Sequence, residues 1–241
     1  MQHFFVKPSD IEKNKITIFG NDAFHITKVL RLHKGNKLTV SDGYNLYEVE
    51  ILRESVKQVK CNILKRVEPK HDKIKLILMQ CLPKSAKMDM IIQKGTELGV
   101  NCFIPLKCKR SIVKLEDKKA AKLKRWQKIA FEASKQSRRI KVPEISHPVS
   151  FIEALNKIPP DALFLMPWEG ETTTSLKDVL GSVRNPKEVY IAIGPEGGFD
   201  EEEVSFAREH GARIVSLGSR IMRTETAGLY VSSVVIYLFS D

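Results

Sequence analysis

The chain has 241 residues, of which 42% are hydrophobic and 29% charged, and its formal net charge is +11. This length and composition suit a globular protein with one large or two small domains, and they exclude a disordered or fibrous chain. No apolar run reaches the roughly 20 residues that a membrane-spanning helix needs. The first residues lack the basic and apolar regions of a secretory signal, so we expect a cytoplasmic protein.

The charge is unevenly distributed along the chain. Residues 1–70 carry a net +5, residues 71–150 a net +12 and residues 151–241 a net −6. Such an asymmetry indicates that the first two thirds bind a polyanion and that the acidic remainder carries out the chemistry. The alternative is a solvated, lysine-rich surface that binds nothing.

Residues 1–70 have the patterns of a small β-rich domain. Apolar and polar residues alternate there as they do in half-buried strands, and a rough apolar face over 22–32 predicts one short helix. We predict a small barrel with strands over 37–40, 47–51 and 59–63. A polar linker with a proline follows over 68–73.

Strand and helix patterns alternate over residues 74–241, which predicts an α/β domain with a mostly parallel sheet. A nearly continuous apolar strand over 74–82 opens it. Apolar residues at helical spacing follow over 88–98, with Gly99 as the C-cap. Later strands are expected over 103–106, 189–193 and 213–217.

A long helix is predicted over 116–139, with a narrow apolar seam through Leu123, Trp126 and Ala130. Like charges three and four residues apart crowd its first half and destabilise an isolated helix. Binding of RNA or DNA phosphates to this face would offset the repulsion between the like charges. The alternative is a face that is only exposed to solvent.

Two further helices close the chain. Asp200 and Glu203 form a capping box at the start of the helix over 200–210, so Glu201 and Glu202 are interpreted as helix-start residues rather than catalysts. The last helix, over 227–239, is apolar almost all round and must be buried. We predict that a second subunit completes this burial, in a homodimer.

The four cysteines, at positions 61, 81, 102 and 108, show no C-x-x-C spacing. Reduced thiols of a cytoplasmic protein are expected rather than disulfides or a zinc site.

The most informative segments are two loops, Ile193 to Phe199 (IGPEGGF) and Leu217 to Ala227 (LGSRIMRTETA). Each follows a buried strand and leads into a helix. Glycines just past a strand let a ligand approach the backbone, and loops at the ends of successive strands predict one shared pocket. A lone glycine-rich loop of this kind is otherwise a tight turn.

The motifs of several common enzymes are missing. The chain contains no P-loop, no dinucleotide-binding glycine pattern and no nucleophile elbow, and its six histidines lie outside both loops. Neither metal nor histidine chemistry is therefore expected. Main-chain groups remain, with a few side chains that suit a nucleoside-like cofactor and an electron-rich second reactant: Arg220, Arg223, Thr224, Glu196 and Glu225.

On these residues the chain resembles the SPOUT (trefoil-knot) methyltransferases, and within them the bacterial 16S ribosomal RNA uridine-N3 methyltransferase family. Residues 1–70 resemble, less distinctively, that family's PUA-like RNA-binding barrel. One departure is Arg138, where family members usually have glycine. The matching stretches are Leu82-Pro83-Lys84, Met88-Asp89 to Gly99, Arg125-Trp126-Gln127-Lys128, Glu132-Ala133, Gln136-Ser137, the GPEGGF loop and Leu217-Gly218 to Ala227.

The resemblance implies a deep trefoil knot, an obligate dimer and S-adenosylmethionine as cofactor. It also implies a target uridine in small-subunit RNA. The two-domain design and the broad positive charge favour the assembled subunit as substrate, and naked RNA is the alternative. The residues expected to hold the cofactor are Leu165, Pro167, Glu169, Gly194, Pro195, Glu196, Gly197, Gly198, Leu217, Gly218, Ile221, Met222, Thr224 and Glu225.

The expected catalytic groups are Arg223 and then Arg220, because a guanidinium near a uracil oxygen stabilises the N3 anion. Alternatively, Arg220 contacts a phosphate, and Arg223 pairs with Glu225 or Glu196 and only shapes the loop. RNA phosphates are expected to meet Lys28, Arg31, Lys34, Lys37, Lys84, Arg125, Gln136, Arg138 and Arg139.

Two other functions stay open at this point. One is a SPOUT enzyme that methylates a ribose 2′-oxygen of another RNA. The other is an RNA-binding assembly factor that keeps the fold without catalysis. A nucleotide-dependent dehydrogenase is a poorer alternative because its glycine pattern is absent.

Overall fold

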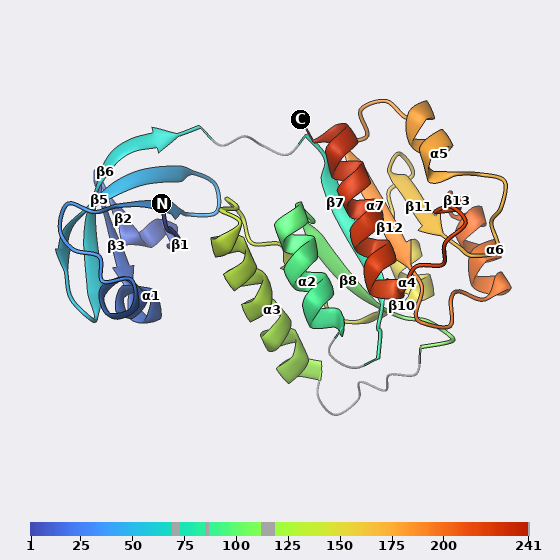
Figure 1. Ribbon diagram of the computed structural model, residues 1–241, viewed down its shortest axis with the longest axis horizontal. Coiled ribbons are helices and arrows are strands. Elements are labelled where there is room, and N and C mark those ends of the chain that lie inside the picture. Colours follow the sequence, from blue (N-terminus) through green and yellow to red (C-terminus); the bar gives the residue numbers. More distant parts are fainter. Residues whose placement is uncertain (69–72, 85–86, 112–118, 241) are drawn as a thin grey trace. The chain divides into compact units, whose positions relative to one another are not determined.

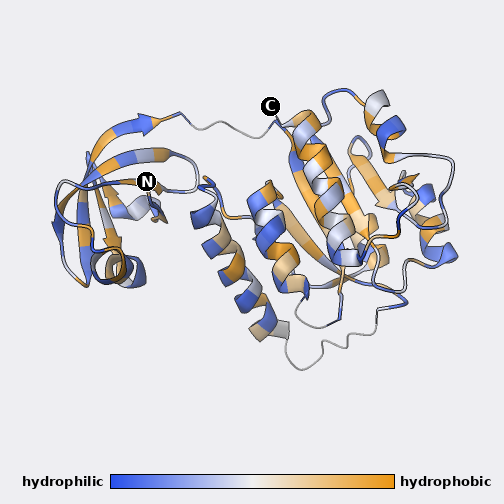
Figure 2. Ribbon diagram, in the orientation of Figure 1, coloured by the Kyte–Doolittle hydropathy of each residue, from blue (hydrophilic) through white to orange (hydrophobic). Residues whose placement is uncertain are grey.

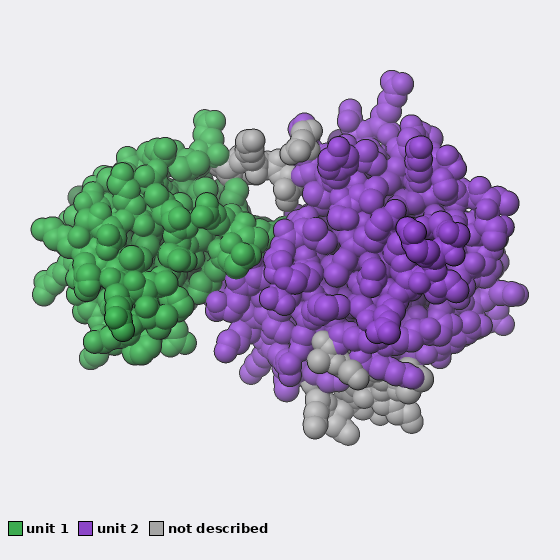
Figure 3. Space-filling model, in the orientation of Figure 1, with its two compact units in different colours: residues 1–71, 134–142 green, residues 72–133, 143–241 purple. Residues whose placement is uncertain are grey.

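The computed structural model describes residues 1–68, 73–84, 87–111 and 119–240. It divides into two compact units (Figure 3): unit 1 comprises Met1–His71 and Ser134–Val142, and unit 2 comprises Asp72–Ala133 and Pro143–Asp241. The domains expected from the sequence were 1–70 and 74–241. The structure differs in that residues 134–142 belong to unit 1, with the N-terminal domain. The linker expected over 68–73 lies mostly outside the described residues.

Unit 1 is a curled six-stranded sheet in the order β1-β4-β5-β6-β3-β2 (Figure 1). Its neighbouring strands are antiparallel, except that β1 pairs with β4 in parallel. The strands are β1 (His3–Phe5), β2 (Ile11–Glu12), β3 (Lys15–Phe19), β4 (Lys37–Ser41), β5 (Leu46–Glu54) and β6 (Gln58–Val67). The short helices are η1 (Pro8–Asp10), α1 (Gly20–Phe24) and the π-helix η2 (His25–Val29).

The segment 134–142 joins unit 1 through contacts that its sequence does not predict. The ammonium of Lys135 lies 2.8 Å from a carboxylate oxygen of Asp22 and 5.4 Å from the centre of the Phe4 ring. The hydroxyl of Ser41 donates to the carbonyl of Ile140 at 2.6 Å. These partners are about 100 residues apart in the sequence, and only the fold pairs them.

Unit 2 contains a parallel sheet in the order β10-β8-β7-β12-β11-β13, with β9 beside β8. Its strands are β7 (Lys75–Cys81), β8 (Cys102–Lys107), β9 (Glu144–Ile145), β10 (Val149–Ser150), β11 (Leu163–Pro167), β12 (Glu188–Ile193) and β13 (Arg213–Val215). Its helices are α2 (Lys87–Leu98), α3 (Lys119–Gln136), α4 (Phe151–Leu155), α5 (Leu176–Ser182), α6 (Glu201–Glu209) and α7 (Thr224–Phe239).

The two faces of this sheet are covered by different helices because side chains of a strand alternate. Ile77, Met79 and Cys81 of β7 face a core that includes residues of α4 and α6. On the other face, a Cβ built on Gly228 of α7 would lie 3.5 Å from Leu78 and 3.2 Å from Gln80. Strands β7, β8 and β12 are mostly orange in Figure 2, as the burial of both faces requires.

Several helix boundaries differ from the expected ones. The single helix expected over 22–32 is α1 followed directly by η2, over 20–29. The basic helix ends at Gln136 rather than Arg139, and its expected start at Glu116 lies outside the described residues. Helix α7 begins three residues before Ala227, at Thr224. No helix in the described part of the chain is long and apolar enough to cross a bilayer.

The chain returns across the sheet at its end. Strand β13 lies at the edge beside β11, yet α7 packs on β7, β12 and α2 (Figure 1). The trefoil knot implied by the resemblance requires this return path.

The expectation of four reduced thiols is wrong, because Cys81 and Cys108 form a disulfide with their Cα atoms 6.0 Å apart. The register pairs Cys81 with Leu106 on adjacent parallel strands, so Cys108, two residues further on, lies on the same face. Cys61 and Cys102 are free thiols, and burial raises their pKa values to about 12 and about 11.

Candidate active site

The carboxyl ends of β7, β11, β12 and β13 share one edge of the sheet because these strands run in parallel. The two glycine-containing loops follow β12 and β13, and the segment 165–169 spans the end of β11, which lies between them. The three segments expected to hold the cofactor therefore come to one place.

The loop after β12 is fixed at both ends. The N–H of Gly198 donates to the carbonyl of Pro195 at 3.0 Å, and the buried Phe199 ring packs 5.4 Å from the ring of Phe151. Gly198 has φ +68°, and a Cβ added there would collide with the carboxylate of Glu169. Glycine is favoured here because it accepts the positive φ without strain, and any side chain would have to displace the exposed Glu169 carboxylate.

A buried hydrogen-bond relay joins this loop to the start of α7. The hydroxyl of Thr224 donates to the carbonyl of Gly194 at 2.5 Å and accepts from the side-chain amide of Gln80 at 2.8 Å. Gln80 is fully buried in β7. The carbonyl of Gly194 is thus already used by the protein, and Thr224 connects the two loops instead of facing a ligand alone.

Lys87, in the first turn of α2, makes a second connection between the same two segments. Its ammonium lies 3.1 Å from Glu196 Oε1 and 3.2 Å from Glu225 Oε2. The carboxylates of Glu196 and Glu225 raise the pKa of Lys87. Burial alone would raise the pKa of Glu196, but its hydrogen bonds with backbone N–H groups and Lys87 lower it overall.

Gln80 and Lys87 were not among the residues singled out from the sequence. The sequence could have identified Gln80, because it is the one polar side chain inside the apolar run from Ile77 to Leu82. It could not have identified Lys87, since a lysine at the start of a helix is ordinarily a solvated residue.

The loop after β13 differs in having exposed side chains. Gly218 has φ +99°, and Ile221 is 91% exposed. Arg220 and Arg223 are exposed, and neither makes a side-chain hydrogen bond or ion pair with another described residue. Among the described residues, the cation that pairs with Glu196 and Glu225 is Lys87 rather than Arg223.

The third segment is held by backbone and carboxylate contacts. The N–H of Trp168 donates to the carbonyl of Val215 at 3.1 Å, which ties the end of β11 to β13. Beyond it, hydrogen bonds from the hydroxyl of Thr173 and from the N–H groups of Thr174 and Thr173 lower the pKa of Glu171 to about 2. Leu165 is buried inside β11, whereas Glu169 is exposed.

The segment after β8 supports the glycine loop from outside. The guanidinium of Arg110 donates to the carbonyl of Gly197 at 2.9 Å, and the N–H of Lys109 donates to Glu203 at 2.9 Å. Asp200 and Glu203 form the expected capping box of α6. Glu202 pairs with the Lys109 ammonium, so this acidic cluster is engaged in structural contacts.

The side chains expected to meet RNA are mostly exposed. Four of them are cations of the β-rich domain of unit 1: Lys28, Arg31, Lys34 and Lys37. Three more lie in the segment 134–142 of the same unit: Gln136, Arg138 and Arg139. Arg138 adopts φ +56°, which is the left-handed region that favours glycine. In unit 2, Lys84 is exposed, and Arg125 forms an ion pair with Asp89.

The chemistry available at this edge is that of main-chain groups, carboxylates and cations. Within the described ranges no cluster of three or more histidine, cysteine, aspartate or glutamate side chains is placed to hold a metal ion.

Two family models match the chain. The model of an RNA methyltransferase domain matches residues 69–236, and that of an RNA methyltransferase PUA domain matches residues 20–64. Among curated proteins, the Ribosomal RNA small subunit methyltransferase E of Bacillus subtilis is 35% identical, over 98% of this chain and 96% of its own length. The protein of that name from Aquifex aeolicus is 31% identical, over 87% of this chain and 89% of its own length.

Solved structures have the same fold. The Neisseria gonorrhoeae Ribosomal RNA small subunit methyltransferase E bound to S-adenosyl methionine matches with a TM-score of 0.88 and 29% identity, over 100% of this chain and 99% of its own. A Legionella pneumophila putative methyltransferase in complex with the same cofactor matches with a TM-score of 0.86 and 31% identity, over 99% of this chain and 98% of its own.

Proposed function

The chain belongs to the ribosomal RNA small subunit methyltransferase E family, and from that premise we propose that it transfers a methyl group from S-adenosylmethionine to N3 of one uridine in small-subunit ribosomal RNA. The match over both units carries this proposal, because it joins an RNA-binding PUA domain to a methyltransferase domain in one chain. Such a substrate places the protein in the cytoplasm.

The residues at the sheet edge fit this cofactor. Gly194 to Gly198 and Leu217 to Met222 offer main-chain groups at the ends of β12 and β13, the two strands that flank β11, and Gly218 leaves open space where a side chain would stand. The exposed carboxylate of Glu169 suits hydroxyl or ammonium groups. When bound, the cofactor supplies a methyl group activated by a sulfonium, so the protein need only align the acceptor and shield it from water.

The acceptor nitrogen requires a further contribution from the chain. Uracil N3–H is a weakly acidic imide, and a guanidinium close to O2 or O4 stabilises the anion that attacks the methyl group. Arg223 is free to do this, because no described side chain neutralises it. Arg220, three residues earlier on the exposed loop, contacts the RNA backbone or assists Arg223.

RNA binding uses the cations of unit 1 and of the basic helix. Phosphate contacts supply affinity rather than base choice, so affinity should fall steeply with salt. The uridine must be turned out of its helix to reach the methyl group. A flat salt dependence would remove the polyanion from this proposal.

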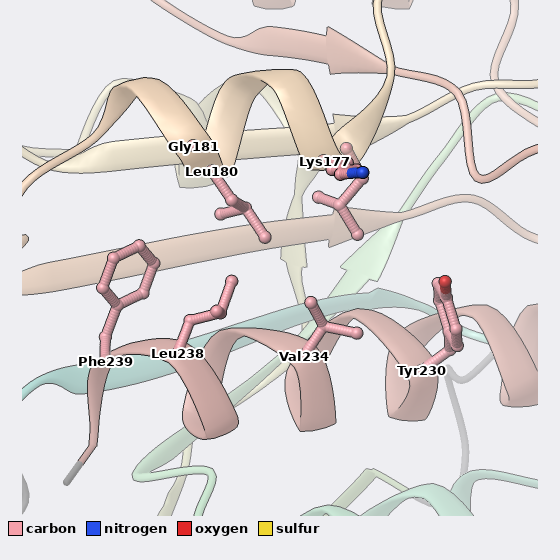
Figure 4. A pocket seen from close by; sticks show the side chains of 8 residues that line it. Lys177, Leu180, Gly181, Tyr230, Val234, Leu238 and Phe239 are labelled. Carbon is pink, nitrogen blue, oxygen red and sulfur yellow. The ribbon is translucent and has the colours of Figure 1, made fainter.

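We further propose that the protein acts as a homodimer through α7. Tyr237 is 82% and Leu238 50% exposed, and an apolar groove of about 310 Å³ lies between α5 and α7 (Figure 4). Val234 and Leu238 point toward Leu180 across this groove. An exposed apolar helix face of this kind is typical of a protein interface.

Light scattering after size exclusion tests the dimer. Wild type should have twice the chain mass of 27.4 kDa, and Leu238→Arg should give the single mass. Ile152→Arg on α4 is the matched control, because Ile152 is 56% exposed and outside the groove. A wild type with the single mass would overturn the dimer.

Methyl transfer tests the reaction. Labelled S-adenosylmethionine is incubated with small subunits that lack the modification, and with naked RNA, before nucleoside analysis. Label in 3-methyluridine is the expected result. Label in a 2′-O-methyl nucleoside would favour the ribose reaction, and no transfer despite cofactor binding would favour an assembly factor.

A further inference from the structure

We propose that Lys87 is a positioning residue for methyl transfer, which holds the glycine loop after β12 and the start of α7 in register through Glu196 and Glu225. This inference deepens the proposed function and rests on it for the identity of the ligand. Lys87 itself does not touch cofactor or substrate in this role.

The geometry distinguishes Lys87 from Lys94, the other lysine of its helix. Its ammonium contacts carboxylates on two segments more than 100 residues away in sequence, at 3.1 Å and 3.2 Å. Among the described residues Lys94 pairs only with Glu97, one turn along the same helix. A local pair of that kind stabilises α2 alone, whereas the pairs of Lys87 fix the positions of two loops.

Burial makes the contact with Glu225 costly to remove. The Glu225 residue is 7% exposed, and its Oε2 atom makes no hydrogen bond within the described part of the chain. The ammonium of Lys87 is therefore the charge that compensates this carboxylate. Without it, the largely buried Glu225 carboxylate would lose its paired cation, and the N-terminal end of α7 would offset its charge only in part.

Glu196 extends the connection to the end of β7. Its Oε1 atom accepts from the N–H of Lys84 at 3.0 Å as well as from Lys87. The carboxylate thus fixes the loop that contains Gly197 and Gly198 to the segments on both sides of it. A shift of this loop would also move the surface where Glu169 meets Gly198.

The Gln80–Thr224–Gly194 relay lies on the same two segments but is buried. It provides the connection inside the core, so the fold does not depend on Lys87 alone. Loss of Lys87 should consequently loosen the outer, ligand-facing part of the two loops while unit 2 stays folded.

Two measurements on the full-length protein test this inference, with Lys87→Ala, Lys87→Arg and the control Lys94→Ala. Hydrogen exchange without cofactor reports how readily the two loops open. Titration calorimetry with S-adenosylmethionine reports its consequence. We expect Lys87→Ala to speed exchange over residues 194–199 and 218–224 and to weaken cofactor binding at least tenfold, with RNA affinity unchanged.

Lys87→Arg should restore most of the affinity because it keeps the charge, and Lys94→Ala should resemble wild type in both measurements. Unchanged exchange in Lys87→Ala, or equal losses in Lys94→Ala, would overturn the positioning role. Absence of cofactor binding by wild type would instead overturn the proposed function, while the exchange data would still decide the role of Lys87.

Discussion

The loops after β12 and β13 lie at the same sheet edge, yet they are held very differently. The first is fixed by contacts of Gly194, Glu196, Gly197 and Gly198 with other parts of unit 2. The second exposes Arg220, Ile221 and Arg223. The first loop is therefore preorganised by contacts within unit 2, whereas the cations of the second loop remain open; in the proposed function the first would hold the cofactor and the second would meet the RNA.

The largest effect should come from the exposed loop. Arg223→Ala removes the proposed donor to the uracil anion, and loss of such a donor costs about 10²–10³-fold in kcat. S-adenosylmethionine affinity should stay near that of wild type, because the first loop is held without Arg223. Methyl transfer and calorimetry measure the two effects.

Arg184→Ala, a change of an exposed arginine away from both loops, is the control for Arg223→Ala. Near-normal turnover of Arg223→Ala would contradict the catalytic role of the exposed loop, since the cation of Arg223 would then not contribute to the reaction.

Gly198→Ala tests the fixed loop. The new Cβ would displace the Glu169 carboxylate, which should weaken cofactor binding on the order of tenfold if a hydrogen bond to a charged group is lost. Gly211→Ala is the matched control, because Gly211 has φ +83° but nothing within 4 Å of the added Cβ.

Both alanine variants should lose about 1–2 kcal/mol of unfolding free energy through the positive φ. Only Gly198→Ala should lose cofactor affinity. Equal affinities in the two variants would show that Glu169 takes no part in binding.

Arg138 extends the comparison to unit 1, where an exposed cation occupies a backbone conformation that favours glycine. Arg138→Gly should raise the free energy of unfolding by about 1 kcal/mol through relief of this conformation. Arg138→Ala keeps the backbone cost and removes only the charge.

Both Arg138 variants should weaken RNA binding and reduce its salt dependence, because each removes one phosphate contact. Urea unfolding and filter binding at several salt concentrations separate the two effects. Unchanged RNA affinity in both variants would remove Arg138 from the RNA-binding surface.

The smallest effect concerns Glu171, which accepts hydrogen bonds from Thr173 and Thr174 in the segment after β11. Its pKa of about 2 in the folded protein lies below its usual value of 4.5, so its contribution to stability is present above pH 4.5 and is lost as the pH falls toward 2. The stability difference between wild type and Glu171→Gln should therefore shrink between pH 6 and pH 3 in urea unfolding. A difference that stays constant over this range would contradict the lowered pKa.

Much of the fold followed from local patterns in the sequence. Alternation of apolar residues located three strands of unit 1, β4, β5 and β6, but not β1, β2 or β3. The apolar runs located β7 and β12, and the capping box located the start of α6. The two loops were recognisable because glycines follow buried strands. These features depend on neighbours within a few residues, which the sequence displays directly.

The pairings between distant residues were decided only by the tertiary structure. They include the Lys87 contacts with Glu196 and Glu225, the disulfide between Cys81 and Cys108, and the grouping of 134–142 with unit 1. A polar side chain can meet many partners in a chain of this length, and its local sequence does not choose among them. Strand order and register make that choice, because they alone bring the ends of β7, β8, β12 and β13 to one edge.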